Sequence, residues 1–137
     1  HDTVRRQRQM CIRDRSIQDD SAPTNSFVGL IHNGPAGGFG RYYDVKAGNV
    51  RQAASSGGET MPIGSFVKTG LAFKTNDFAF FINGSLNATD SSGTIPSTVD
   101  EMTLGHRSTG TSFISGIIKK ITYHASRIKN DFVKRLI

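Results

Sequence analysis

Residues 77–84 read DFAFFING, and this stretch decides the fold. The apolar residues Phe78, Phe80 and Ile82 alternate along it, which is typical of a β-strand with one buried face. The Asn-Gly dipeptide that follows suits the two positive φ angles of a type I′ turn. Residues 85–89 then return as the partner strand, so the stretch predicts an antiparallel hairpin.

Similar strand signals flank this hairpin on both sides along the chain. They predict further strands at residues 26–32, 41–50, 66–73, 101–106 and 113–125. Segments rich in Gly, Pro, Ser or Asn separate the strands at intervals of about 8–12 residues, and no strand–helix–strand rhythm occurs. The pattern indicates an all-β fold, an antiparallel β-sandwich such as a jelly roll.

The last two predicted strands carry more specific expectations. Met102 and Leu104 alternate in the first of them, and we expect both to point into the core. Ile118 in the second is out of phase with the apolar residues after it, which predicts a bulge near Lys119 and Lys120.

The chain ends in a segment with helical spacing, residues 130–137. We expect a short helix that Asn130 caps, because an asparagine side chain can accept a hydrogen bond from the first turn. Phe132, Val133 and Leu136 would then pack on the sheet.

Length and composition limit the fold and its environment. The chain has 137 residues, 36% of them hydrophobic, which suits one domain. We expect no membrane insertion, because no apolar stretch approaches the ~20 residues that a spanning helix needs. No apolar core of a signal peptide follows the first arginines. A single cysteine excludes a disulfide framework and a zinc site built from cysteines.

The first 15 residues differ from the rest in composition. They hold five arginines and the only cysteine, Cys11, and the run RRQRQMCIRDR at residues 5–15 resembles the conceptual translation of a sequencing adapter, as met in metagenomic sequences. A genuine arginine-rich arm is the alternative. We expect residues 1–15 to be artefactual and disordered, and residues 16–137 to form an N-terminally truncated domain.

Leaving residues 1–15 out changes what the net charge of the chain indicates. The net charge of +6 falls to +3 when residues 1–15 are left out, since they carry five arginines and two aspartates. A charge of this size suits solubility and does not indicate a surface for polyanions. We therefore expect no nucleic-acid partner.

Four segments of the second half carry a family resemblance. They are the strand and Asn-Gly hairpin at 71–84, the loop DSSGTIP at 90–96, the strand MTLG at 102–105, and FISGIIKKITY at 113–123. Together they resemble the concanavalin A-like lectin/glucanase family in its laminin-G-like form, a jelly-roll domain common in phage structural and tail-associated proteins. Lys129 departs from the serine that usually caps the final helix of this family.

The residue pattern for glycoside hydrolysis does not occur in the chain. Glucanases on this fold carry Glu-x-Asp-x-(x)-Glu on one strand, since hydrolysis with retention needs two carboxylates about 5–5.5 Å apart. The two glutamates here, Glu59 and Glu101, are far apart in sequence, and Glu101 follows Asp100 directly, so that these neighbours would face opposite sides of a strand. No Gly-x-Ser-x-Gly elbow occurs, and we expect no enzyme activity.

The candidate binding residues form two clusters. A sugar site needs an exposed aromatic ring beside amide, acidic or arginine groups, and Tyr42, Tyr43 and Asp44 fit this description, as do His106 and Arg107. One of two adjacent tyrosines must point outward from a strand. The alternative is that these are surface residues without a ligand.

Calcium is the one cofactor that the loops suggest. The resemblance implies it, because some laminin-G-like domains bind calcium through loop carboxylates, and Asp77 and Asp90 are the acids available here. Their alternative role is hydrogen bonding at turns and strand ends.

The expected function follows from the family resemblance and from the absence of a catalytic carboxylate pair. It is a non-catalytic carbohydrate-binding or adhesion module of a phage virion or tail-associated protein, located on the virion or at the cell surface. Its partners would be a cell-surface glycan and other virion proteins. Two alternatives stay open, a structural decoration or oligomerisation domain without a ligand and a non-catalytic fragment of a glycoside hydrolase, because a fold alone does not establish a ligand.

Overall fold

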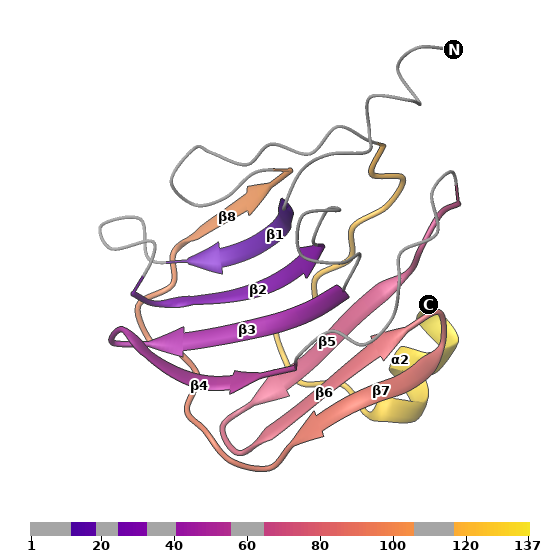
Figure 1. The fold of residues 1–137 in the computed structure, drawn as a ribbon. Coiled ribbons are helices and arrows are strands. Elements are labelled where there is room, and N and C mark those ends of the chain that lie inside the picture. Colours follow the sequence, from indigo (N-terminus) through magenta and orange to yellow (C-terminus); the bar gives the residue numbers. More distant parts are fainter. Residues whose placement is uncertain (1–11, 19–24, 33–40, 56–64, 106–116) are drawn as a thin grey trace.

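Two antiparallel sheets and one short helix make up the described part of the chain (Figure 1). The computed structural model describes residues 12–18, 25–32, 41–55, 65–105 and 117–137. The elements are β1 (Ile12–Gln18), β2 (Phe27–His32), β3 (Arg41–Ala47), β4 (Val50–Ala54), β5 (Thr69–Lys74), β6 (Asp77–Ile82), β7 (Ser85–Asp90), β8 (Glu101–Leu104) and α2 (Asn130–Leu136). One sheet has the strand order β4-β3-β2-β1-β8 and the other β5-β6-β7. The predicted all-β antiparallel fold with a short C-terminal helix is confirmed.

The main hydrophobic core lies between the two sheets. Its buried members come from both, and they are Val28, Tyr43, Val45, Ala53, Phe78, Phe80 and Ile82. The rings of Tyr43 and Phe80 join the two layers, with their centroids 5.7 Å apart. Removing this apolar surface from water is the main force that holds the sheets together.

The helix α2 covers the opposite face of the three-stranded sheet. Val133, 6% exposed, belongs to a second buried cluster whose other members are Ala72, Ala79 and Phe81. Gly70 on β5 permits the close approach, because a Cβ there would lie 3.3 Å from Val133 Cγ1. β6 is therefore covered on both faces, which accounts for its unbroken apolar run FAFFI.

The hairpin predicted from DFAFFING is confirmed as β6 and β7. Its turn has positive φ angles at Asn83 (48°) and Gly84 (81°). The Asn83 backbone N–H donates to the Lys68 carbonyl at 2.8 Å, and the Asn83 Oδ1 accepts from the Lys68 backbone N–H at 2.9 Å. The turn thus also fixes the segment that leads into β5.

A second tight hairpin lies where the sequence predicts one continuous strand. β3 ends at Ala47 and β4 begins at Val50, so residues 41–50 are not a single strand. Gly48 and Asn49 form the turn, with φ angles of 57° and 65°. A glycine-asparagine pair between two strand-like runs is itself a hairpin signal, and it identifies this turn.

The edge position of β8 corrects the prediction for its apolar residues. Met102 pairs with Ile17 of β1, which in turn pairs with the core residue Val28, so Met102 lies on the core face of its sheet. Met102 and Leu104 are nevertheless 43% and 42% exposed. They are not buried because β8 is an edge strand, and the three-stranded sheet lies toward the opposite edge (Figure 1).

The strand predicted at residues 113–125 is wrong over its described part. Residues 117–125 form no strand, and Ile117 and Tyr123 are 71% and 58% exposed. The expected bulge near Lys119 and Lys120 is therefore not formed either. No single strand register can bury both Ile117 and its neighbour Ile118, because adjacent residues face opposite sides. Residues 113–116 lie outside the described ranges.

The first strand begins within the segment that the sequence analysis expects to be artefactual and disordered, residues 1–15. Residues 12–15 form the first half of β1, which pairs with β2 on one side and β8 on the other. The expected boundary between residues 15 and 16 therefore falls inside a strand. Main-chain hydrogen bonds of a sheet are the same for any residue except proline, so an unusual composition does not prevent pairing.

The start of α2 differs from the prediction by one residue. Lys129 is the N-cap, with extended backbone angles and no side-chain cap hydrogen bond, whereas Asn130 is already helical. Val133 is buried, but Phe132 and Leu136 are 44% and 45% exposed. The helix is short and meets the sheet along a narrow line, so the two residues expected beside Val133 face away from the sheet.

Candidate functional site

The predicted tyrosine and aspartate site is divided between two faces of β3. Tyr43 is 1% exposed and belongs to the main core, whereas Asp44 is 2% exposed and alternates to the other face. Asp44 accepts two hydrogen bonds from Arg51, at 2.9 Å from Nε and 3.1 Å from Nη2. The structure therefore gives both residues a role in the fold and does not bring them together at a surface.

The side chains of the other predicted binding residues lie outside the described part of the chain. The backbone of Tyr42 belongs to β3, opposite Ile31, but its side chain is outside the described part. His106 and Arg107 are both outside the described ranges.

Burial of Tyr43 has a consequence at alkaline pH. Desolvation raises the pKa of the Tyr43 hydroxyl above its ordinary value of 10.0, and the negative charge of Asp90 raises it further. The folded state keeps this proton where the unfolded state releases it, so the contribution to stability is full below pH 10.0 and is lost as the pH rises through the raised pKa.

We expect Tyr43→Phe to remove this part of the alkaline destabilisation. Urea unfolding between pH 8 and pH 11 measures it. The free energy of unfolding of the original protein should fall more steeply above pH 10 than that of the variant. Equal slopes would show that Tyr43 titrates normally in the fold.

The two calcium candidates do not share a site. Asp90 pairs with Phe78 across β6 and β7 and therefore lies on the core side, whereas Asp77 alternates to the side that faces α2. The Asp90 carboxylate accepts hydrogen bonds from the backbone N–H and the hydroxyl of Ser92, at 2.9 and 3.0 Å. Asp77 forms an ion pair with Arg127 at 2.8 Å. Within the described residues, no group of three or more His, Cys, Asp or Glu side chains is placed to hold a metal.

The loop after β7 joins the two sheets. Asn76 donates its backbone N–H to the Gly93 carbonyl at 2.8 Å, and its Oδ1 accepts the Gly93 N–H at 3.0 Å. Thr94 donates both its backbone N–H and its hydroxyl to Gln52 Oε1 on β4, each at 3.1 Å. The motifs around Asn76 and DSSGTIP that carry the family resemblance thus serve the fold here.

Arg127 ties the start of α2 to β6. Its side chain is 11% exposed, and Nη2 donates to Asp77 Oδ1 at 2.8 Å and to Asn130 Oδ1 at 2.7 Å. Nη1 donates to the Ile128 carbonyl, and Nε is buried with no hydrogen-bond partner in the described part of the chain. The positive charge of Arg127 is thus paired with Asp77 within the protein.

We expect Arg127→Ala to lower the free energy of unfolding by about 2 kcal/mol, because it removes charged hydrogen bonds and leaves their acceptors without a donor. Urea denaturation measures the loss. The control is Lys134→Ala, which removes only an exposed pair with Asp131 at 3.8 Å and should change stability by less than about 0.5 kcal/mol. Equal losses in both variants would contradict an anchoring role for Arg127.

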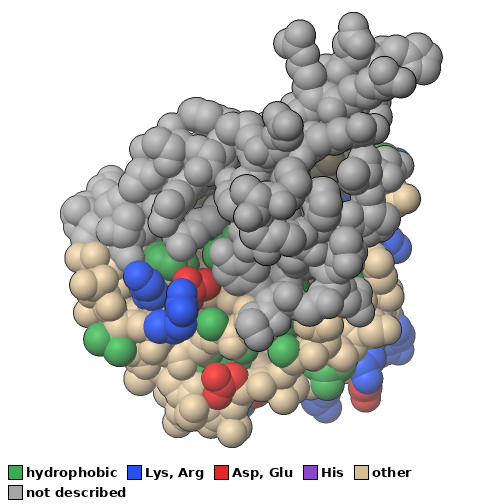
Figure 2. All heavy atoms as spheres, in the orientation of Figure 1, with side chains coloured by type: hydrophobic (Ala, Val, Ile, Leu, Met, Phe, Trp, Pro, Cys, Tyr) green, Lys and Arg blue, Asp and Glu red, His purple; other side chains and the backbone are tan. Residues whose placement is uncertain are grey.

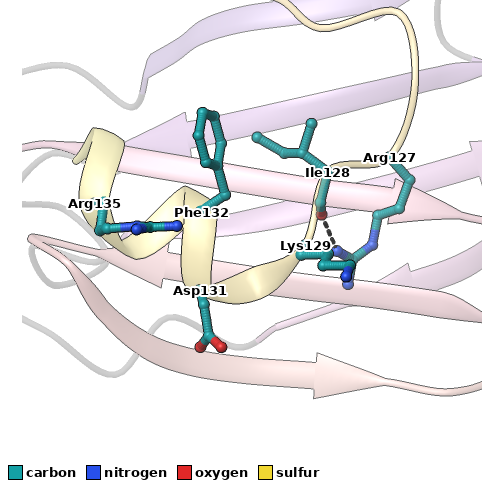
Figure 3. Close-up of a pocket in the computed structure, with 6 residues that line it drawn as sticks. All are labelled: Arg127, Ile128, Lys129, Asp131, Phe132 and Arg135. Atoms are coloured by element: carbon teal, nitrogen blue, oxygen red, sulfur yellow. Dashed lines mark hydrogen bonds between the residues drawn. The ribbon is translucent and has the colours of Figure 1, made fainter.

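A shallow hollow of about 550 Å³ lies beside this anchor. It is lined by a mixture of apolar and charged side chains, Arg127, Ile128, Lys129, Asp131, Phe132 and Arg135 (Figure 3). Phe132 and Ile128 project to the same side of the segment, and Asp131 points away from them (Figure 3). The Arg135 guanidinium carbon lies 5.7 Å from the centre of the Phe132 ring, at cation–π distance.

The hollow is not among the sites expected from the sequence, where Phe132 is assigned to the sheet contact. The signal for it is the stretch RIKNDFVKR at 127–135, which places four cations close to three apolar residues. Such a stretch can be recognised as a site only when the orientation of the helix on the sheet is known. The side of α2 that carries Val133 meets the sheet, which leaves the ring of Phe132 accessible.

Comparisons with known proteins add little to this geometry. No family model and no curated protein matches the sequence. A solved structure of an S-layer domain-containing protein (residues 221–444) from Clostridium thermocellum ATCC 27405 superposes with a TM-score of 0.45 at 13% identity. The alignment covers 88% of this chain and 60% of that chain. No helix among the described residues is long and apolar enough to cross a membrane. The likeness is too low to assign a family.

Proposed function

We propose that this protein is a non-catalytic carbohydrate-binding module of the concanavalin A-like lectin type, on a virion or at a cell surface. The observation that carries the proposal is the hollow beside α2, where the 44% exposed Phe132 stands next to cations and an apolar neighbour, Ile128. An all-β sandwich is the fold that this family resemblance implies. The phage origin rests on that resemblance alone.

The chemistry of the hollow suits a sugar. One face of a pyranose ring consists of C–H groups that can pack on an aromatic ring, and its hydroxyl groups need charged or polar partners. Phe132 offers the ring, while Lys129 and Arg135 offer donors at its margin. On the side drawn in Figure 2, hydrophobic side chains of the described residues form small patches among polar surface.

A glycan array tests the proposal directly. We expect the folded protein to bind a defined set of glycans and Phe132→Ala to lose at least tenfold in affinity, which corresponds to about 1.4 kcal/mol. The matched control is Leu136→Ala on the same helix, because Leu136 is 45% exposed and does not line the hollow. Binding that survives in the Phe132 variant would move the site elsewhere, and no binding by a folded protein would reject the function.

A structural module without a ligand is the second candidate. The observation that favours it is the exposed apolar segment at 117–123, where Ile117 is 71% and Tyr123 58% exposed. Such a segment is a candidate for packing against another protein. Sedimentation analysis of the folded protein would show self-association that Tyr123→Ser weakens, together with a blank glycan array.

A further inference from the structure

The side chains around the hollow carry more positive than negative charge, and two residues account for most of this excess. The positive charge of Arg127 is compensated by Asp77, at 2.8 Å. Asp131 is the one carboxylate in the lining; it lies 3.8 Å from Lys134 and points away from Phe132 (Figure 3). Lys129 and Arg135 remain, and in the described part of the chain no carboxylate forms an ion pair with either of them.

These two cations flank the apolar part of the hollow. Lys129 immediately precedes α2, and Arg135 lies in its last turn with its guanidinium over the Phe132 ring. The ring contact restrains the Arg135 side chain, which lowers the entropy that a ligand would have to remove. A carboxylate bound there would pair its own charge with that of the donor and could accept two parallel N–H bonds from the Arg135 guanidinium, which a neutral hydroxyl cannot do.

We infer that the hollow selects acidic sugars, with one uronate carboxylate at Arg135, a second at Lys129 and the pyranose face on Phe132 and Ile128. This inference rests on the proposed glycan-binding function and narrows its substrate class. A neutral sugar would make the ring contact but leave the positive charge of both side chains uncompensated by the ligand.

Calorimetric titration with trigalacturonic acid and with its methyl ester separates charge from shape. The two probes share their rings and differ in their carboxylates, which are uncharged in the ester. We expect the acid to bind at least tenfold more tightly than the ester at low salt, and the advantage to shrink in 0.5 M NaCl because salt screens exposed charges. The double substitution Lys129→Gln with Arg135→Gln should abolish the advantage.

Lys134→Gln is the matched control, because it removes one positive charge from the same helix at a residue that does not line the hollow. It should keep the preference for the acid. Equal binding of acid and ester, or an acid preference that the double variant retains, would overturn the inference while leaving glycan binding intact. If neither probe binds and the glycan array is also blank, the proposed function fails and the inference fails with it.

Discussion

Phe80→Ala is expected to destabilise the protein by about 4 kcal/mol, close to the whole stability of a small domain. Phe80 is 0% exposed and lies at the meeting point of the two sheets, where its ring centroid is 5.7 Å from that of Tyr43. Truncation removes the apolar contacts of a full ring and leaves a cavity that the rigid β6 backbone cannot close. We expect a large drop in the urea midpoint or a chain that no longer folds at 25 °C.

Leu86→Ala is the control for Phe80→Ala. Leu86 belongs to the adjacent strand β7 but is 43% exposed, so its truncation should cost about 1 kcal/mol or less. The milder substitution Phe80→Leu keeps the measurement possible if the alanine variant does not fold. A loss below about 1 kcal/mol for Phe80→Ala would contradict the placement of the core between the two sheets.

Gly93→Ala is expected to cost about 3 kcal/mol, the second largest effect. The backbone at Gly93 has a φ of 123°, a conformation that residues with a side chain rarely adopt, and an added Cβ would lie 2.6 Å from the Gln52 carbonyl oxygen. The loop would have to move, which would break the hydrogen bond from the Gly93 N–H to Asn76 Oδ1 and the one from the Thr94 N–H to Gln52 Oε1. Thermal and urea unfolding measure the loss.

Gly48→Ala separates the two causes of this effect. Gly48 also has a positive φ, 57°, but nothing lies within 4 Å of the position of its Cβ. Its substitution should cost about 1 kcal/mol, from backbone strain alone. If both variants lost the same stability, the contact between the loop and β4 would not contribute, and the loop would not join the sheets.

The parts of the fold that the sequence predicts are those with local signals. The Asn83-Gly84 turn and the alternation before it need no information from elsewhere in the chain, and both are confirmed. Gly48 and Asn49 give a similar turn signal, which the interpretation of residues 41–50 as one strand overlooks. The all-β class follows from the number of such signals.

The parts that the sequence does not predict depend on contacts between distant segments. Met102 has the right phase for burial, but its position at a sheet edge leaves it exposed. Asp44 resembles a binding residue in the sequence, but in the structure its carboxylate forms an ion pair with Arg51. The hollow beside α2 requires the pairing of Asp77 with Arg127, 50 residues later, which fixes how the helix lies on the sheet.

The most direct test of the account is a titration of the ¹⁵N-labelled protein with the glycan that binds best on the array, followed by NMR. We predict that the backbone amide shifts that change most cluster at residues 127–136, around Phe132, and that the same titration of Phe132→Ala leaves them unchanged. Shift changes centred on other loops, with residues 127–136 unaffected, would contradict the claim that the hollow beside α2 is the binding site.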